Sequence, residues 1–359
     1  MPLTVRGEIP FNAETPLGLL RKHFVTPQGL FFVRNHGGVP EVDPAGYRLS
    51  VSGLVRRPLS LSLDEIRHAF PRTTVTATLQ CAGNRRKDFL AIAPIPGEVP
   101  WDAGAIGNAE WTGVPLREIL QAAGVGPGAR HAAFTGLDQI ERDGHTFGFG
   151  GSIPIAKALG EEVLLAYEMN SEPLTPLHGF PLRVVAPGYI GARSVKWLAE
   201  ITVQDQPSAN YFQAHAYKLF PPHVGPETAD WATGLSLGES PVNAVICRPA
   251  DGEVVQAGSV LVQGFAIGGG GRTIERVDLS TNDGETWVTA HLVGDPHPWS
   301  WRFWEAELNL VPGPARIVAR AWDSAAQTQP EDARKIWNFK GYVNNAWHRV
   351  TLDVTSASQ

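Results

Sequence analysis

The hydrophobic pattern of this chain changes near residues 220–240, and this change limits the possible folds more than any other feature. Before it, strand-like and helix-like segments are mixed without a regular strand–helix–strand rhythm, which is typical of an α+β domain. A proline-rich stretch follows, and after it only short strand-like segments remain. The 359 residues are enough for two separate hydrophobic cores. We therefore expect one domain over residues 1–235 and a second over residues 236–359.

The second domain is predicted to contain only β-strands. Asn282-Asp283-Gly284 is a strong turn signal between two strand-like segments. Gly268–Gly271 lies in the same all-β region, and we expect it to form a hairpin loop. Five or more short strands favour a sandwich of the immunoglobulin type, although the Cys–Trp–Cys pattern of true immunoglobulin domains is absent. The strands are expected over residues 260–267, 274–281, 286–290, 300–308 and 315–322.

The first domain is predicted to hold short helices and strands behind an irregular arm of residues 1–45. Ser62 and Glu65 form a capping-box signal, which opens a short helix. A second helix over residues 115–123 begins with proline and is followed by Gly124. The remaining segments are a helix over 153–159 and strands over 30–33, 47–53, 75–79, 163–167, 182–186 and 197–203.

The composition argues against several classes of protein. The chain has 30 Lys+Arg against 36 Asp+Glu, a formal charge of −6, so we expect no nucleic-acid partner. No apolar run approaches the roughly 20 residues of a membrane helix, so no membrane span is expected. Cys81 and Cys247 lie in different expected domains, which argues against a disulfide. The glycine-rich stretches 148–151 and 268–271 lack the strand–turn–helix context of a dinucleotide site, so NAD is not expected.

The two ends of the chain bear on its location and on haem. The N-terminus has no apolar signal segment, so a cytoplasmic protein is expected if Met1 is the natural start. A leader that had been removed would instead indicate the periplasm. No Cys-x-x-Cys-His occurs and neither end has residues to spare for a haem domain, so no haem is expected.

Residues 79–87, Leu-Gln-Cys-Ala-Gly-Asn-Arg-Arg-Lys, place a cysteine beside three cations. The predicted strand before them ends at residue 79, so Cys81 starts a loop. Neighbouring cations favour the thiolate, which is the form that binds a metal or attacks an electrophile. A buried core cysteine beside a solvated basic run is the alternative interpretation.

Residues 79–86 resemble the molybdenum-ligand loop of the sulfite oxidase family. Three more stretches resemble the same family in the same order, and together they extend over nearly the whole chain: Phe-Phe-Val-Arg-Asn-His at 31–36, His-Gly-Phe-Pro-Leu-Arg at 178–183 and Asn-Ala-Trp-His-Arg-Val at 345–350. The resemblance implies an α+β molybdopterin-binding domain followed by an immunoglobulin-like sandwich that makes a homodimer.

The resemblance assigns Cys81 as the molybdenum ligand of a molybdopterin cofactor. A single thiolate without a companion ligand suits a metal whose other ligands come from an organic cofactor. Asp138 could instead cap a turn, and His178 could be an ordinary loop histidine. Arg183 and Lys196 are stronger candidates, because both lie in or beside apolar strands, where a charge needs a partner. The full set of cofactor-binding residues that the resemblance implies is Phe32, Val33, Arg34, Asn35, His36, Asp138, His178, Arg183, Ser194, Val195 and Lys196.

The resemblance also implies a pocket for sulfite, a small anion that needs several converging cations. It assigns this role to Arg34, Arg86 and Lys340. Trp101 would form a wall of the pocket and Tyr217 would hydrogen-bond the reactive oxygen; core packing is the alternative for both aromatic residues. Lys340 stands where the family usually has arginine, and an ammonium lacks the planar fork of a guanidinium.

The activity implied by the resemblance is oxidation of sulfite to sulfate by oxygen-atom transfer. Two electrons would then pass to oxygen or to an external carrier such as a cytochrome. Nitrate reduction and sulfane dehydrogenation are the alternatives within the family, and a cation at position 340 favours sulfite over nitrate. A cofactor-free binding module with a sandwich for oligomerisation is the alternative outside enzymes, and molybdenum content distinguishes it.

Overall fold

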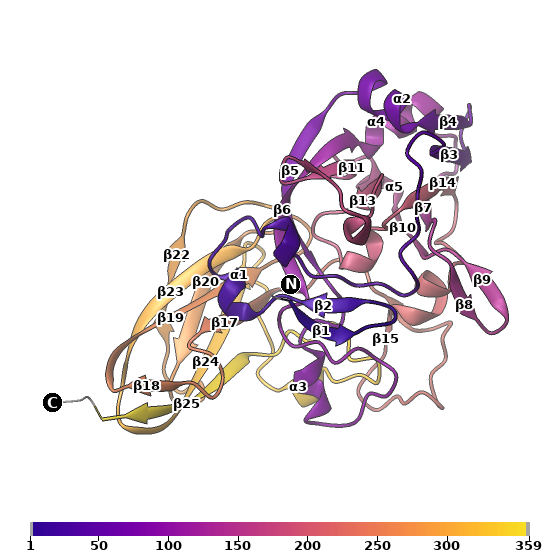
Figure 1. Cartoon of the computed structure of the whole chain (residues 1–359). Helices are drawn as coiled ribbons and strands as arrows, with labels where there is room; N and C mark the ends of the chain where they lie inside the picture. The colour runs from indigo at the N-terminus through magenta and orange to yellow at the C-terminus, as the bar shows by residue number, and fades with distance from the viewer. Residues whose placement is uncertain (1–2, 357–359) are drawn as a thin grey trace.

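The computed structural model describes residues 3–356 and shows two groups of sheets side by side (Figure 1). Residues 1–2 and 357–359, the outer ends of the two expected domains, lie outside this description. The strands that follow residue 240 gather in one body, drawn in orange and yellow. The mixed strands and short helices of the first part form the other. The predicted α+β part followed by a β-sandwich is confirmed.

The first part is built on two sheets that face one another. One has the strand order β10-β7-β14-β3-β4, and in the other, β12-β11-β6-β5, β13 also pairs with β11. The strands of the first sheet are β3 (Arg48–Gly53), β4 (Leu59–Ser62), β7 (His131–Gly136), β10 (Gly150–Pro154) and β14 (Leu198–Gln204). Those of the second are β5 (Thr73–Gln80), β6 (Ile106–Pro115), β11 (Leu164–Met169), β12 (Glu172–Pro173) and β13 (Arg183–Val185).

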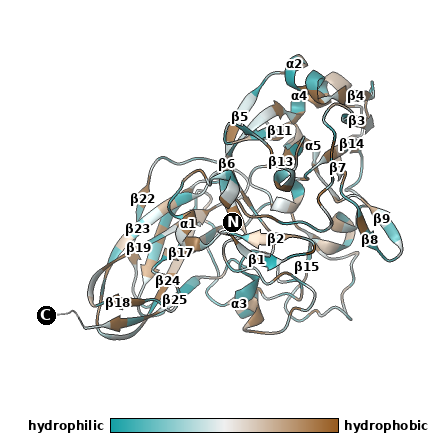
Figure 2. Ribbon diagram, viewed as in Figure 1, coloured by the Kyte–Doolittle hydropathy of each residue, from teal (hydrophilic) through white to brown (hydrophobic). Residues whose placement is uncertain are grey.

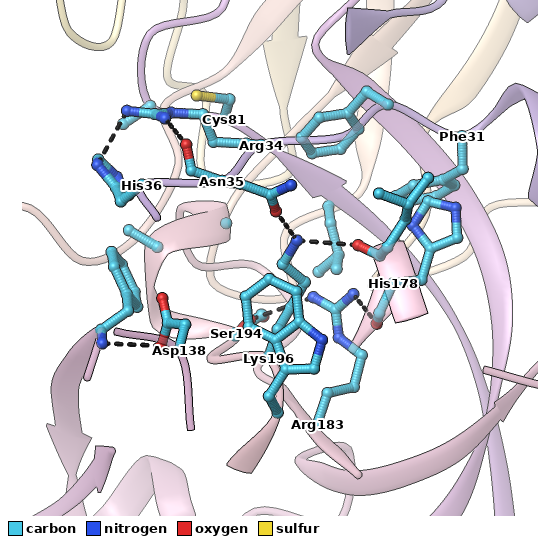
Figure 3. A pocket seen from close by; sticks show the side chains of 18 of the residues that line it. Phe31, Arg34, Asn35, His36, Cys81, Asp138, His178, Arg183, Ser194 and Lys196 are labelled. Carbon is cyan, nitrogen blue, oxygen red and sulfur yellow. Dashed lines mark hydrogen bonds between the residues drawn. The ribbon is translucent and has the colours of Figure 1, made fainter. Parts of the chain in front are cut away.

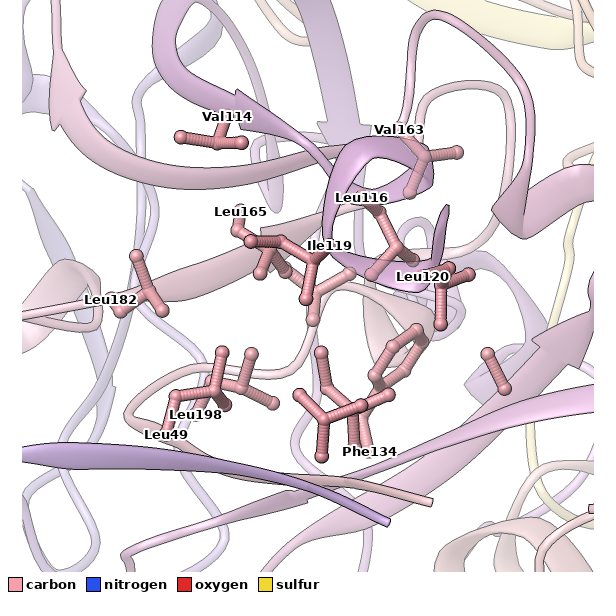
Figure 4. Packing of buried hydrophobic residues seen from close by; sticks show 14 of the residues in the cluster. Leu49, Val114, Leu116, Ile119, Leu120, Phe134, Val163, Leu165, Leu182 and Leu198 are labelled. Atoms are coloured by element: carbon pink, nitrogen blue, oxygen red, sulfur yellow. The ribbon is translucent and has the colours of Figure 1, made fainter. Parts of the chain in front are cut away.

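Short helices close this part, and the expected signals at their ends are confirmed. Helix α2 (Leu63–Ala69) opens on the Ser62–Glu65 capping box, in which each side chain bonds the other residue's backbone. Helix α4 (Leu116–Ala123) follows Pro115 and ends at Gly124, whose φ of 71° suits glycine. Its Leu116, Ile119 and Leu120 pack into the core between the two sheets (Figure 4). The other helices are α1 (Leu17–Leu20), α3 (Arg86–Leu90) and α5 (Ile155–Ala158).

The N-terminal arm is more regular than predicted. It contains a hairpin of β1 (Thr4–Gly7) and β2 (Asn12–Glu14), helix α1 and a 3₁₀ turn at Gln28–Leu30. The strand expected over residues 30–33 is reduced to one bridge, between Val33 and Ala13. The expectation of an irregular arm was wrong because β1 and β2 pair with each other, which no turn signal in the sequence indicates.

The second part is a sandwich of two sheets, with strand orders β17-β19-β23-β22 and β18-β25-β24-β20-β21. The predicted turn at Asn282–Gly284 joins β20 to β21, with φ of 53° at Asp283 and 98° at Gly284. The glycines 268–271 connect β19 in one sheet to β20 in the other, so the expectation of a hairpin there was wrong. The strand bounds are β17 (Asn243–Arg248), β18 (Val254–Gln256), β19 (Gly258–Ile267), β20 (Ile274–Ser280), β21 (Val288–Thr289), β22 (His291–Val293), β23 (Arg302–Leu310), β24 (Gly313–Asp323) and β25 (His348–Thr355).

Two further hairpins lie outside the main sheets: β8 (Ile140–Arg142) with β9 (His145–Phe147), and β15 (Lys218–Leu219) with β16 (Leu235–Ser236). Apolar residues are spread over many short segments (Figure 2). Within residues 3–356 no helix has the length and apolar character needed to cross a membrane.

The last part of the chain returns to the first domain before it enters β25. Val343 donates its backbone N–H to the Ala82 carbonyl at 2.7 Å, one residue beyond Cys81. Arg85 extends from the first domain to the second and donates hydrogen bonds to Asn243 Oδ1 at 2.8 Å and to the Ala346 carbonyl at 2.7 Å. Residues from both parts of the chain are therefore brought to the Cys81 loop.

Candidate active site

A cavity lies beside Cys81 (Figure 3). The wall is formed by segments far apart in the sequence: residues 31–36, the loop after β5, and the stretch around β13 and residues 191–197. Asp138, Phe149 and Tyr217 complete it.

Cys81 lies directly after β5 and presents its sulfur to this cavity. The side chain is buried, and Sγ accepts a hydrogen bond from the Gly83 N–H at 3.4 Å. A Cβ at Gly83 would lie 2.5 Å from an Arg86 guanidinium nitrogen, so a side chain there would displace that guanidinium. The loop thus fixes the direction of the sulfur, as a metal-ligand cysteine requires.

Only one of the three cations that follow Cys81 remains close to the site. Arg85 has a left-handed φ of 65° and turns into the sandwich. Lys87 is exposed and pairs with Asp102 at 3.0 Å. The expectation that all three cations beside Cys81 in the sequence favour its thiolate was therefore wrong for Arg85 and Lys87, because the loop turns at Arg85 and sends neighbouring side chains in different directions.

Two cations in the cavity wall, Arg183 and Lys196, form hydrogen bonds only to neutral groups, although the charge of Asp138 also acts on Lys196. Arg183 donates to the His178 carbonyl at 2.9 Å and to the Ser194 carbonyl at 3.1 Å. Lys196 donates to Asn35 Oδ1 and, at 2.9 Å, to the Leu177 carbonyl. Desolvation lowers the pKa of Arg183 to about 9 and holds that of Lys196 well below its usual value.

Neither Arg183 nor Lys196 forms an ion pair within the part of the chain that the structure describes. Cations withdrawn from water are costly unless an anion is close. The two residues and the cavity between them therefore fit an anionic group such as the phosphate of a pterin cofactor.

A hydrogen-bonded chain leads from Arg34 through His36 to Tyr217. Arg34 Nη2 lies 3.1 Å from His36 Nδ1, and His36 Nε2 lies 2.8 Å from the Tyr217 hydroxyl. Desolvation between Phe149 and Phe212, with the charges of Arg34 and other cations, holds the pKa of His36 well below its usual value. The ring is therefore neutral.

The direction of this chain follows from the donors available. Arginine only donates, so His36 Nδ1 accepts and the proton resides on Nε2, which donates to the Tyr217 oxygen. Burial raises the pKa of Tyr217, which keeps its hydroxyl protonated. Because that oxygen already accepts from His36, the hydroxyl hydrogen is free to point into the cavity that Tyr217 lines. Tyr217 is thus a fixed hydrogen-bond donor.

A second group of charges lies next to this chain and outside the cavity wall. Arg86 Nη2 is 3.5 Å from Glu98 Oε2, and Lys340 Nζ pairs with the other oxygen of the same carboxylate. The Arg86 guanidinium lies 5.4 Å from the Tyr342 ring, which stacks on Tyr217 with 5.2 Å between centroids. The stacked rings of Tyr217 and Tyr342 therefore connect the Arg34–His36–Tyr217 chain to this second group of charges.

Trp101 is fully buried in the apolar cluster that contains Cys81. Its Nε1–H has no acceptor among residues 3–356. A buried donor without a partner is rare in proteins and indicates a ligand or a water.

The structure separates the predicted site residues that line the cavity from those that do not. Val33 and Val195 lie outside the cavity wall, since Val33 pairs with Ala13 and Val195 belongs to the core between the sheets. Arg86, Trp101 and Lys340 surround the site without lining the cavity. The cavity wall itself includes Phe32, Arg34, Asn35, His36, Cys81, Asp138, His178, Arg183, Ser194, Lys196 and Tyr217.

Several site residues were missed by sequence reasoning. Phe149 stacks on His36 at 5.1 Å, and Trp197 lies 4.3 Å from Lys196 Nζ. Glu98 and Tyr342 belong to the second group of charges. Trp197 directly follows a predicted stretch and could have been included, whereas a glutamate in a proline-rich loop has no recognisable motif. The other unpredicted wall residues are Phe31, Leu79, Ala82, Leu177, Gly191 and Ala192.

Two family models match the chain and together define its class. Residues 36–212 match the oxidoreductase molybdopterin binding domain, and residues 236–355 match the Mo-co oxidoreductase dimerisation domain. The fold and the cavity beside Cys81 are therefore those of a molybdopterin-dependent oxidoreductase.

Individual relatives identify the family within this class. Sulfite oxidase of Gallus gallus is 45% identical over 97% of this chain and 77% of its own length. Nitrate reductase [NADH] 2 of Phaseolus vulgaris is 37% identical over 97% of this chain and 42% of its own length. The solved structure of the sulfane dehydrogenase SoxCD from Paracoccus pantotrophus superposes with a TM-score of 0.81, covering 96% of this chain and 85% of that chain at 27% identity. The chain belongs to the sulfite oxidase family.

Proposed function

We propose that this protein is a molybdenum-dependent enzyme that oxidises sulfite to sulfate. Two findings support the proposal: the chain's sequence similarity to sulfite oxidases over nearly its full length, and the presence of Arg34 in the wall of the cavity that Cys81 lines. The single observation that carries it is the fixed arrangement of Arg34, His36 and Tyr217 at the cavity that Cys81 lines.

The residues present fit a molybdopterin cofactor. Cys81 would bind the metal, and Arg183 and Lys196 would supply the charge for its phosphate end. When bound, the cofactor supplies oxygen-atom transfer to sulfite and accepts two electrons. Asn35 and His178 would hold the pterin through hydrogen bonds, while Asp138, which accepts the Phe149 N–H at 2.9 Å, fixes the wall behind it.

The residues around the metal ligand would bind and orient the substrate. Arg34 provides a charge-assisted hydrogen bond to a sulfite oxygen, and Arg86 and Lys340 add positive charge from the second group. Trp101, buried in the apolar cluster that contains Cys81, would support the pocket by packing behind it. Tyr217 stays protonated and donates a hydrogen bond at the reacting position, since His36 holds its oxygen in place.

The proposal extends to the assembly and to the electron acceptor. The matched dimerisation domain supports a homodimer through the sandwich, and sedimentation of the full chain tests it. The electrons would pass to oxygen or to an external carrier such as a cytochrome. Stopped-flow reoxidation of the reduced protein by air and by cytochrome c would distinguish the two.

The test of the proposed activity is a comparison of substrates on one preparation. The protein, expressed with molybdate and analysed for bound molybdenum, is assayed with sulfite, nitrate and a sulfane-sulfur compound. We expect turnover with sulfite that exceeds turnover with the other two. A protein that carries molybdenum but turns over nitrate or the sulfane and not sulfite would contradict the proposal.

A further inference from the structure

Glu98 occupies an unusual position for a carboxylate in a site that is built for anions. It lies in the loop between α3 and β6, and its side chain is 14% exposed. One oxygen pairs with Lys340 Nζ, and the other lies 3.5 Å from Arg86 Nη2. The carboxylate thus bridges two of the three cations that the proposed function assigns to the substrate.

The other contacts of the two cations are to neutral groups. Arg86 also donates to the Lys340 carbonyl at 3.0 Å and to the Val99 carbonyl at 2.7 Å. Within the described residues, Glu98 is the one acid that forms an ion pair with Arg86 or with Lys340. When no substrate is bound, Glu98 is their counter-ion.

This ion-paired group is close enough to the cavity to affect it. Burial raises the pKa of Tyr217, and the charge of Glu98 contributes to the same shift. Desolvation lowers the pKa of His36, and Lys340 and Arg86 are among the cations that add to it. Both affected residues belong to the chain that begins at Arg34.

A carboxylate that bridges two cations makes the same kind of contact as a sulfite or sulfate oxygen. Without it, Arg34, Arg86 and Lys340 would repel one another around an unfilled pocket. With it, a substrate must displace or share the carboxylate and gains less from the two cations. Removing the charge therefore strengthens the attraction that the site offers to an oxoanion.

We propose that Glu98 is a positioning residue that sets the oxoanion affinity of the site by acting as the resident counter-ion of Arg86 and Lys340. It keeps both cations in place and prevents strong retention of sulfate, the product. The inference rests on the proposed function, because it takes the oxoanion to be sulfite or sulfate.

The experiment measures sulfate binding to the molybdenum-loaded protein by isothermal titration calorimetry at fixed ionic strength. Glu98→Gln keeps the shape of the side chain and removes its charge. We expect the dissociation constant of sulfate to fall about tenfold or more, the KM for sulfite to fall in parallel, and kcat to change less. Glu98→Asp, which keeps the charge on a shorter side chain, should give an intermediate value.

Glu162→Gln is the matched control. Glu162 pairs with Lys157 at 2.5 Å, and its side chain is 16% exposed, close to the value for Glu98. Because Glu162 pairs with Lys157 and not with Arg86 or Lys340, its variant should bind sulfate as the unmodified protein does.

Sulfate binding by Glu98→Gln that is unchanged or weaker than in the unmodified protein would overturn the inference. If that variant loses its molybdenum, the same titration on Glu98→Asp decides, and a constant equal to that of the unmodified protein would overturn it. Absence of sulfite turnover in the unmodified protein would refute the proposed function, while the sulfate titration would still test Glu98.

Discussion

The two groups of cations in this protein are neutralised in different ways. Arg183 and Lys196, in the cavity wall, donate hydrogen bonds only to carbonyl and amide oxygens. Arg86 and Lys340, next to the cavity, share the Glu98 carboxylate. The first pair would face a cofactor and the second pair would face a substrate.

The difference follows from how long each ligand stays bound. A cofactor remains through the working life of the protein, so its phosphate can serve as a permanent counter-ion for Arg183 and Lys196. A substrate leaves after each turnover, and cations that waited for it alone would be unpaired much of the time. A resident carboxylate solves this problem at the cost of weaker substrate binding.

The largest expected effect is at Cys81, the proposed metal ligand of the cofactor that Arg183 and Lys196 would contact. Cys81→Ser should abolish sulfite turnover, because an oxygen ligand is harder and changes the electronic properties of the metal. The control is Cys247→Ser in the sandwich. Burial raises the pKa of Cys247 to about 12, which keeps it a neutral thiol in an apolar cluster. Steady-state kinetics should show full turnover per bound molybdenum in the control, and sulfite turnover in Cys81→Ser would remove the basis for the site.

Arg34 has no carboxylate partner within residues 3–356 and contacts Asn12, the Asn35 carbonyl and His36. In lacking a carboxylate partner, Arg34 resembles Arg183 and Lys196, although its proposed ligand is the substrate. Arg34→Gln should raise the KM for sulfite about tenfold or more, through loss of a charge-assisted contact of roughly 1.5–3 kcal/mol. Arg48→Gln, at an exposed arginine, should leave KM unchanged. An unchanged KM in Arg34→Gln would mean that Arg34 only supports His36.

A smaller effect is expected when the geometry of the second group changes and its charge does not. Lys340→Arg should lower the KM for sulfite a few-fold without a fall in kcat, because a guanidinium can bind Glu98 and an anion oxygen together. Lys340→Met should raise KM instead. If neither variant shifts KM by more than about twofold, well under the ~1.4 kcal/mol of a tenfold effect, Lys340 does not act on the substrate.

His348 offers a buried base that belongs to neither group. It lies in the sandwich, and its Nδ1 accepts the Ile246 N–H at 3.2 Å. Burial, with the charges of Arg85 and Arg349, holds the pKa of His348 well below its usual 6.5. Below pH 6.5, His348 therefore binds a proton in the unfolded chain but stays neutral in the folded chain. The free energy of unfolding consequently decreases as the pH falls from 6.5.

His348→Asn should remove this contribution. Urea unfolding is measured between about pH 7 and pH 5. On unfolding, the variant should take up fewer protons than the unmodified protein, by at most about one. Turnover per bound molybdenum should be unaffected, because His348 does not line the cavity. An identical pH dependence in both proteins would show that His348 is already protonated in the folded state.

The sequence predicted those parts of the fold and site that depend on neighbouring residues. Helix α2 follows its capping box, and α4 stops at the glycine that permits a left-handed φ. Cys81 follows a strand as expected and lines the cavity. Arg183 and Lys196 also line it, as their apolar flanks indicated. In each case the deciding signal lies within a few residues.

What the sequence did not predict depends on contacts between distant segments. Glu98 pairs with Lys340, 242 residues away, and nothing near either residue indicates that contact. Arg85 and Arg86 are adjacent and equally basic, yet the left-handed turn at Arg85 sends one into the sandwich and the other to Glu98. The glycines at 268–271 connect two sheets because of the topology of the sandwich, which local turn signals cannot report.

The most direct test of the contrast between the two groups is the cofactor content of two matched variants, Lys196→Met and Lys340→Met. Both replace a half-buried lysine by an uncharged side chain of similar length. Molybdenum is measured by mass spectrometry and the pterin by the fluorescence of its oxidised form. We expect Lys196→Met to lose most of both, and Lys340→Met to keep about one molybdenum per chain with a raised KM for sulfite. Full cofactor content in Lys196→Met, or an equal loss in both variants, would contradict the assignment of one group to the cofactor and the other to the substrate.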